Sequence, residues 1–205
     1  MDTKAMFKIG YGLYVLTAQE NGFDNGCIIN TVSQVTSTPN RISIAVNKVN
    51  KTHDMILSTG KFNVSVLTTS APFDIFKAFG FRSGKDTDKF KDFAYKIDDS
   101  DCPYITEHVC SVLRCKVLSM EDLGTHTVFI AEVKDAVVTG SNPPLTYAEY
   151  QSKIKPKPEI KQEKEIVGWR CKICGFEIME KELPADYVCP LCGHPREDFE
   201  PIYAE

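Results

Sequence analysis

The residues most suited to chemistry form two short segments near the C-terminal end, Cys171-Lys172-Ile173-Cys174-Gly175 and Cys189-Pro190-Leu191-Cys192-Gly193. Each segment is a Cys-x-x-Cys pair followed by glycine, and 14 residues separate the pairs. In a tight turn both cysteines of a pair point into one concavity, and the glycine lets backbone N–H groups turn toward the sulfurs. Two such turns facing each other predict a metal site whose ligands are Cys171, Cys174, Cys189 and Cys192.

The identity of the metal stays open at this point. Four thiolates hold iron or zinc, and the spacing between the pairs is compatible with either ion. A segment of about forty residues buries too little apolar surface to fold alone, so the metal is expected to supply folding energy. Zinc would make the segment a structural ribbon, whereas iron would let it carry one electron.

A second candidate site is the basic segment that contains Asn47, Lys48, Lys51 and Thr52. Thr52 is typical of a helix N-cap, and Gly60 is a suitable stop for that helix. Helix N-termini offer free N–H groups and partial positive charge, which suit a phosphate group. A solvated basic turn explains the same residues equally well.

The elements that must position these residues are mainly strands. Alternating or β-branched runs predict strands over residues 11–17, 27–36, 41–46, 61–67, 109–118 and 127–138, with a turn over residues 22–26. Two helices are expected, one from Thr52 to Gly60 and one from a cap at Ser70 to Gly80. Many short strands with two helical insertions predict a mainly β fold, a closed or nearly closed barrel with short decorating helices.

Composition divides the chain into three parts. Residues 151–166 are half charged, contain two prolines and no aromatic residue, and are expected to form an extended charged linker. It separates a large domain, residues 1–150, from a small domain, residues 167–205. The small domain carries 8 acidic and 4 basic side chains, so it is the acidic part of the chain.

Bulk properties narrow the class of protein. The chain has 205 residues, 42% of them hydrophobic, and a net charge of −4, which argues against a nucleic-acid partner. The sequence shows neither a signal peptide pattern nor an apolar run of membrane-spanning length, so we expect no membrane partner and a cytoplasmic, reducing location. The eight cysteines are therefore not interpreted as disulfides. Cys27, Cys102, Cys110 and Cys115 are expected to be small buried apolar residues.

The small domain resembles rubredoxins. The resemblance rests on Tyr187-Val188-Cys189-Pro190-Leu191-Cys192-Gly193, on Trp169 and other aromatic residues, and on the tail 197–202. The gap between the cysteine pairs is similar to that of compact rubredoxin modules fused to other redox proteins. This resemblance implies a mononuclear iron bound by four cysteines, with zinc as the alternative.

Residues 9–150 resemble the flavin reductase family, whose fold is an FMN-binding split β-barrel. In the first matching patch, backbone and small hydroxyls would lie along the flavin ring; without the resemblance, an ordinary strand explains this patch better. It consists of Asn30, Thr31, Val32, Ser33, Gln34 and Val35. The second patch is the basic segment of Asn47, Lys48, Lys51 and Thr52, which handles the FMN phosphate in the family.

Two more patches complete the resemblance. Ser83, Gly84 and Lys89 match a segment near the flavin, and Lys89 would stabilise the anionic reduced ring, although a charged surface loop is the plain alternative. In Gly124-Thr125-His126, the histidine matches one that faces flavin and nicotinamide in the family. Thr125 replaces the usual acid, which leaves the orientation of His126 open. Of the four histidines, only His126 is expected to act in catalysis, through alignment for hydride transfer.

The two halves make chemical sense together, because a flavin can accept a two-electron hydride and release single electrons to a one-electron iron site. The whole resembles high-molecular-weight rubredoxins, which are flavin reductase–rubredoxin fusions of anaerobes. That resemblance implies electron transfer from NAD(P)H through FMN and iron to a redox partner such as a flavodiiron oxygen or nitric oxide reductase. It also implies a homodimer. The alternatives are a flavin reductase with a structural zinc ribbon and a non-enzymatic FMN- or metal-binding module.

Overall fold

The computed structural model describes residues 1–85, 87–156 and 165–204. The chain forms two compact units, Met1–Lys155 and Pro156–Glu205. The chain is still helical where the charged linker was expected to begin, because a short helix, η2, spans Tyr150–Ile154. Strand β10 begins at Ile166, the last residue of that expected linker. Residues 157–164, the middle of the expected linker, lie outside the described residues.

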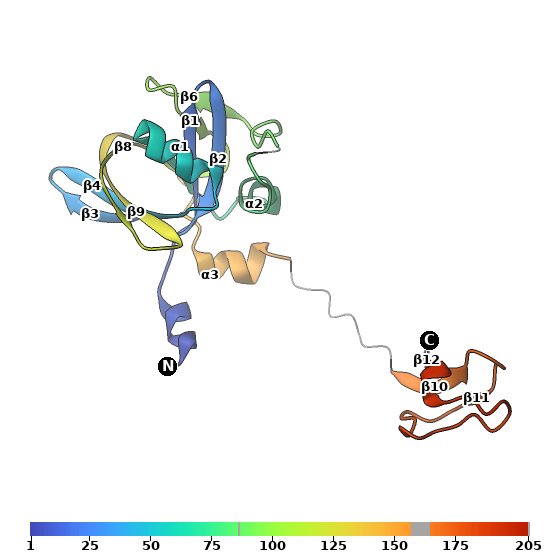
Figure 1. Ribbon diagram of the computed structural model, residues 1–205. Helices are drawn as coiled ribbons and strands as arrows, with labels where there is room; N and C mark the ends of the chain where they lie inside the picture. The colour runs from blue at the N-terminus through green and yellow to red at the C-terminus, as the bar shows by residue number, and fades with distance from the viewer. Residues whose placement is uncertain (86, 157–164, 205) are drawn as a thin grey trace. The chain divides into compact units, whose positions relative to one another are not determined.

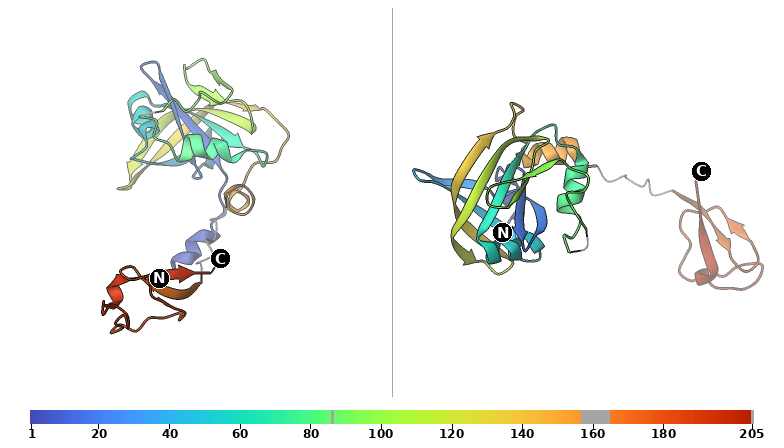
Figure 2. Two further views of the ribbon diagram at one scale, coloured as in Figure 1. Left: turned by 90° about the vertical axis from the view of Figure 1, so that its right-hand side faces the viewer. Right: turned by 90° about the horizontal axis from the view of Figure 1, so that it is seen from above.

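The larger unit is built on one curved antiparallel sheet of seven strands in the order β2-β1-β5-β8-β9-β4-β3 (Figure 1). These strands are β1 (Tyr14–Glu20), β2 (Phe23–Ile29), β3 (Ser33–Ser37), β4 (Asn40–Asn47), β5 (Lys61–Leu67), β8 (Val109–Asp122) and β9 (His126–Val138). Within the described ranges no ladder joins the edge strands β2 and β3, so the barrel is split. Seen from above, the strands curl around the barrel interior, which apolar side chains fill (Figure 2). The predicted mainly β split-barrel fold is confirmed.

Shorter elements surround the sheet. The larger unit also contains η1 (Thr3–Lys8), α1 (Lys51–Thr59), α2 (Phe73–Gly80), α3 (Tyr147–Glu149), η2 and the hairpin of β6 (Tyr95–Ile97) with β7 (Pro103–Ile105). In both views that show it, η1 stands away from the barrel (Figures 1 and 2). The smaller unit has a three-stranded sheet of β10 (Ile166–Cys171), β11 (Glu177–Ile178) and β12 (Phe199–Tyr203), and a short helix, η3 (Arg196–Asp198).

The barrel encloses a first apolar core that follows from strand periodicity. In β4, Ile42, Ile44 and Val46 alternate with half-exposed residues and point inward. Met55 and Ile56 from α1 close this core from one side. The sequence pattern of this segment predicts a strand with one solvent-exposed face. The same alternation determines which face of β4 points into the barrel interior.

A second core covers the outer face of β1, which is why β1 is buried on both sides. Leu16 points into the barrel, whereas Val15 belongs to the second core together with the apolar face of α2. Phe76 of α2 packs against Tyr150, with ring centroids 4.3 Å apart. The C-terminal helical turn of the larger unit is therefore anchored to α2 rather than belonging to a linker.

Several local predictions were wrong, and local backbone chemistry explains them. The reversal between β1 and β2 needs only Asn21 and Gly22, at φ 53° and 77°, so β2 already begins at Phe23 inside the expected turn. Helix α1 starts at Lys51 with Asn50 as N-cap, and Thr52 is a buried helical residue. The strand expected over residues 27–36 is interrupted by residues 30–32.

The second helix also begins later than expected, at Phe73 with Pro72 as N-cap. Pro72 is in an extended conformation, with ψ 156°, and no side chain caps this helix. The four barrel cysteines fit the predicted apolar role in part. Cys27, Cys102 and Cys115 are buried, whereas Cys110 is half-buried.

The loop between β6 and β7 is organised by the buried carboxylate of Asp98. Its Oδ1 accepts hydrogen bonds from Ser100 N, Ser100 Oγ and Cys102 N at 2.7–3.0 Å, and its Oδ2 accepts one from Asn63 Nδ2 at 2.9 Å. Burial alone would raise the pKa of Asp98, but these hydrogen bonds outweigh it and lower the pKa below its ordinary value of 3.8.

Replacing Asp98 by Asn should lower the free energy of unfolding at pH 7 by about 2 kcal/mol, because charge-assisted hydrogen bonds to a buried carboxylate are lost. The folded pKa lies below the unfolded one, so this stabilisation is complete above pH 3.8 and is lost as the pH falls through the folded value. Urea unfolding measures this free energy at both pH values. The difference in free energy of unfolding between the variant and the unaltered protein should be smaller below pH 3.8 than at pH 7. Asp99→Asn is the control, since the Asp99 side chain is fully exposed.

Candidate functional site

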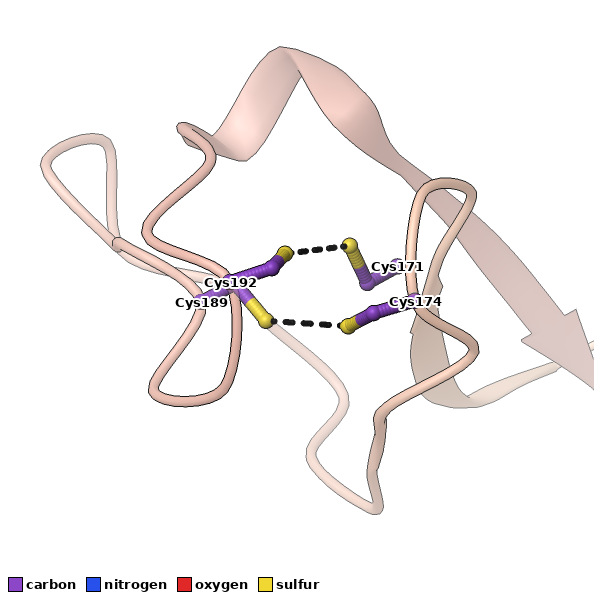
Figure 3. Close-up of side chains that lie close together, drawn as sticks. All are labelled: Cys171, Cys174, Cys189 and Cys192. Carbon is purple, nitrogen blue, oxygen red and sulfur yellow. Dashed lines mark hydrogen bonds between the residues drawn. The ribbon is translucent and has the colours of Figure 1, made fainter.

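The smaller unit brings its four predicted ligand cysteines together (Figure 3). Their sulfurs all lie within 4.8 Å of one another. The closest pairs across the site are Cys171 with Cys192 at 3.7 Å and Cys174 with Cys189 at 3.5 Å. A tetrahedral metal with bonds of about 2.3 Å to sulfur would place its ligands about 3.8 Å apart, so the four thiols fit such an ion.

Both cysteine turns are built in the same way. Gly175 N donates to Cys171 O and Gly193 N donates to Cys189 O, each at 2.9 Å. Both glycines have a positive φ, 76° and 71°, which a residue with a Cβ adopts only with strain. These left-handed glycines close the turns and turn the following amides toward the sulfurs.

Backbone amides inside the turns favour the thiolate form of the first cysteine of each pair. Burial acts to raise the pKa of Cys189, but the amides of Cys192 and Leu191 donate to its sulfur and help lower the pKa to about 7. The pKa of Cys171 is likewise lowered, against burial, by the amides of Cys174 and Ile173. This amide cage is the arrangement that a negatively charged metal–thiolate centre needs.

The site is open on one side. Cys174 is exposed, and its neighbour Ile173 and the matching Leu191 of the second turn are 56% and 71% exposed. His194 Nδ1 lies 3.3 Å from Cys192 Sγ and 3.2 Å from Cys192 O. A centre placed this way could exchange electrons through its exposed edge without a change in ligand geometry.

In the larger unit, strand pairing joins two of the predicted flavin patches. Asn47, the last residue of β4, pairs with His126, the first residue of β9. Lys48 N donates to Thr125 O at 3.1 Å, and Lys48 Nζ forms an ion pair with Asp122 at 2.5 Å. The expected phosphate seat and the expected catalytic histidine therefore lie side by side, although about eighty residues separate them in sequence.

The orientation of His126 is set by the residue that replaces the usual acid. Thr125 Oγ1 lies 2.9 Å from His126 Nδ1. With Nδ1 engaged by the threonine hydroxyl, Nε2 is the ring nitrogen left for a ligand.

The start of α1 presents two lysines and an uncapped helix end. No side chain caps this helix, because Asn50 makes no cap hydrogen bond. Lys51 Nζ lies 3.6 Å from Glu20, and Thr52 is fully buried with no hydrogen-bond partner for its Oγ1. An uncapped N-terminus with two nearby amines fits a phosphate group, whereas the buried Thr52 hydroxyl offers it no contact.

The first patch runs beside the same end of β4. Thr31 Oγ1 donates to Ala45 O at 2.7 Å and accepts from Ala45 N at 3.2 Å, so the loop of Asn30, Thr31 and Val32 is tied to β4. The remaining members lie on edge strand β3 and are exposed. These are Ser33, Gln34 and Val35.

The third patch packs on β2 and is more buried than a charged loop would be. Lys89 is only 6% exposed, and its Nζ donates to Gly26 O at 2.7 Å. Gly84 lies so close to Asn25 that a Cβ would fall 2.1 Å from Asn25 Oδ1. Ser83 Oγ accepts from Lys85 N. Cys27 of β2 lies close to both Lys89 and Thr52, so this patch and the start of α1 approach the same buried cysteine.

Sequence reasoning missed three residues of this region. Asp122 holds Lys48, and its pKa is lowered mainly by that hydrogen bond. His53 and Thr127 form a buried hydrogen bond of 2.9 Å between α1 and β9. Their contacts join segments that are distant in sequence, so no local pattern marks these three residues. The only sequence signal is that they lie close to the predicted residues His126 and Thr52.

Comparisons with known proteins agree with this geometry. Residues 6–154 match the flavin reductase like domain, and residues 169–200 match the rubrerythrin, rubredoxin-like domain. The chain is 34% identical to a high molecular weight rubredoxin of Moorella thermoacetica, over 98% of this chain and 100% of that protein. It is 41% identical to a ferric-chelate reductase (NAD(P)H) of Archaeoglobus fulgidus, over 77% of this chain and 93% of that protein.

Solved structures show the same fold for the larger unit. Flavoredoxin from Methanosarcina acetivorans has a TM-score of 0.58 at 25% identity, covering 63% of this chain and 69% of that chain. An NADH:FAD oxidoreductase of Streptomyces globisporus has a TM-score of 0.64 at 22% identity, covering 69% of this chain and 84% of that chain.

Fold and site together define a flavin-dependent oxidoreductase of the flavin reductase type that carries a rubredoxin-like metal module. The chain belongs to the flavin reductase-like family and, within it, to the high molecular weight rubredoxins. Among the described residues, no helix is long and apolar enough to cross a membrane.

Removing the metal ligands should unfold the smaller unit and leave the barrel intact. Among the described residues, its apolar core has only four buried members, two of them ligand cysteines, so we expect most of its folding energy to come from the metal. Trp169 is the only tryptophan of the sequence and packs, partly buried, against this core. Cys174→Ser or a strong chelator should shift its fluorescence to longer wavelength, while the β-sheet circular dichroism of the barrel persists.

Cys110→Ser is the matched control, because Cys110 lies in the barrel and outside the metal site. An unshifted tryptophan spectrum in the fully chelated protein would show that the smaller unit folds without metal.

Proposed function

We propose that this protein transfers electrons from NAD(P)H through FMN to an iron held by Cys171, Cys174, Cys189 and Cys192, and from there to a redox protein. The observation that carries this proposal is a four-thiolate site in the same chain as a flavin reductase-like barrel. When bound, FMN would supply a hydride acceptor that releases single electrons, and iron would supply a one-electron site.

The barrel residues would bind and align rather than react. The uncapped start of α1, with Lys48 and Lys51, would hold the FMN phosphate. Thr31 and the neighbouring backbone would lie along the ring, and Lys89 would add a positive charge from behind β2. His126, fixed at Nδ1 by Thr125, would align ring and nicotinamide through Nε2.

Iron is favoured over zinc because of what surrounds the thiolates. The amide cage would stabilise the additional negative charge of a reduced centre. The exposed edge at Cys174 would let a redox partner approach the centre for electron transfer. A structural zinc ribbon would need neither the exposed edge nor a flavin reductase-like domain in the same chain. The 41% identity to a ferric-chelate reductase supports a one-electron output from the barrel as well.

The partner is proposed to be a flavodiiron protein, an oxygen or nitric oxide reductase. The smaller unit offers the acidic residues Glu197, Asp198 and Glu200, which would steer a basic surface toward the metal. A cytoplasmic location and a homodimer complete the proposal. Exposed apolar side chains at the turn end of the β8–β9 hairpin support the dimer, namely Leu118, Met120 and Leu123.

Anaerobic spectroscopy tests the function as a whole. Protein loaded with FMN and iron should lose both its flavin band and its ferric tetrathiolate absorption when NADH or NADPH is added. In Cys174→Ser, which lacks one ligand, only the flavin band should bleach.

Two other results would assign a different function. A colourless, zinc-containing smaller unit would make the chain a flavin reductase with a structural ribbon. Failure of both nicotinamides to bleach the flavin would leave a binding module.

Lys48→Met should weaken FMN binding about tenfold, the effect of losing one charge-assisted contact to phosphate. The loss should be larger at low ionic strength, since a half-exposed amine is screened by salt. Quenching of flavin fluorescence measures the affinity. Lys61→Met is the control, an exposed lysine on β5; an equal loss there would mean that overall charge, not a phosphate seat, attracts the flavin.

A further inference from the structure

His53 is a buried histidine that neither the phosphate seat nor the hydride step requires. It lies in the first turn of α1 and is only 3% exposed. Its Nε2 is 2.9 Å from Thr127 Oγ1, and its Nδ1 is 3.0 Å from Asp54 Oδ1. The ring packs against Phe129 at a centroid distance of 5.9 Å. A polar ring this deeply buried is normally retained only with its hydrogen bonds made.

The two partners of His53 define its orientation. The Asp54 carboxylate can only accept, so Nδ1 carries a proton. In the neutral ring Nε2 is then an acceptor, and the Thr127 hydroxyl donates to it. Each of these atoms therefore acts only as a donor or only as an acceptor. The contact holds α1 in one position relative to β9.

Thr127 connects this contact to the candidate catalytic histidine. It is buried, follows His126 directly and pairs with Val46 of β4. Because side chains alternate along a strand, Thr127 points into the barrel while His126 points to the opposite face. His53 in turn sits next to Thr52 and two residues from Lys51. One hydrogen bond thus joins the proposed phosphate seat to the strand end that carries His126.

We propose that His53 is a positioning residue that, through Thr127, fixes the start of α1 relative to His126 so that both ends of one FMN molecule are held together. The inference rests on the proposed flavin function. It assigns no contact between His53 and the ligand. A ligand that spans two elements binds best when those elements are fixed beforehand, because the ordering cost is then absent from binding.

Two variants remove the link from its two sides. Thr127→Val keeps the shape of the side chain and removes only the hydroxyl, and His53→Leu removes the ring nitrogens. Titrating flavin-free full-length protein with FMN should show affinities about tenfold weaker for each. The double variant should be no weaker than His53→Leu alone, since both changes break the same bond. Thr127→Ser, which keeps the hydroxyl, should bind FMN like the unaltered protein.

Thr17→Val separates positioning from general stability. Thr17 Oγ1 is also fully buried, on the outer face of β1 that carries Val15, and donates to Pro103 O of β7 at 2.5 Å. This variant should melt at a lower temperature but bind FMN normally.

The outcomes distinguish this inference from the proposed function. Unchanged FMN affinity in folded Thr127→Val, or failure of Thr127→Ser to restore it, would overturn the role of His53 while the flavin function stands. If the unaltered protein bound no FMN, the role of His53 and the proposed flavin function would both be wrong.

Discussion

The register of β4 against β9 is the constraint on which the flavin region depends. It pairs Ile44 with Phe129 and Val46 with Thr127 inside the barrel, and Asn47 with His126 at the strand ends. A slip of one residue would turn Phe129 outward and His126 into the core, so burial of the apolar set enforces a single pairing. The candidate site is therefore positioned by residues buried inside the barrel, and His126 faces its side of the sheet because its neighbours must face the other.

The metal centre is positioned by local backbone geometry rather than by the burial of apolar side chains. Each cysteine turn satisfies its own carbonyl through a left-handed glycine and turns its amides toward sulfur. The same local arrangement occurs twice and needs only that two turns face each other. This explains why a unit with so small an apolar core can hold a defined site, and why we expect its stability to depend on a bound ion.

This difference determines what the sequence can reveal. Cys171, Cys174, Cys189 and Cys192 were predictable as one site because their spacing encodes the turns. Strand β5 was likewise predicted with its observed bounds, Lys61–Leu67, from alternation alone. The flavin patches were recognisable only one by one, since pairing of β4 with β9 depends on the whole sheet. The His53–Thr127 contact spans 74 residues and leaves no local sequence pattern. The N-cap of α1 was predicted at Thr52 but lies at Asn50, which makes no side-chain cap hydrogen bond.

The lysines of the flavin region separate into two physical kinds. Lys48 and Lys51 form partly exposed pairs with Asp122 and Glu20, and such pairs contribute little to stability because water competes for both charges. Exchanging either carboxylate for a phosphate would therefore cost little, which leaves these amines available to a ligand. Lys89 differs, since its buried amine bonds the Gly26 carbonyl and burial lowers its pKa. Moving it would leave a buried acceptor unpaired, so Lys89 can act on a flavin only as a fixed charge and not as a mobile contact.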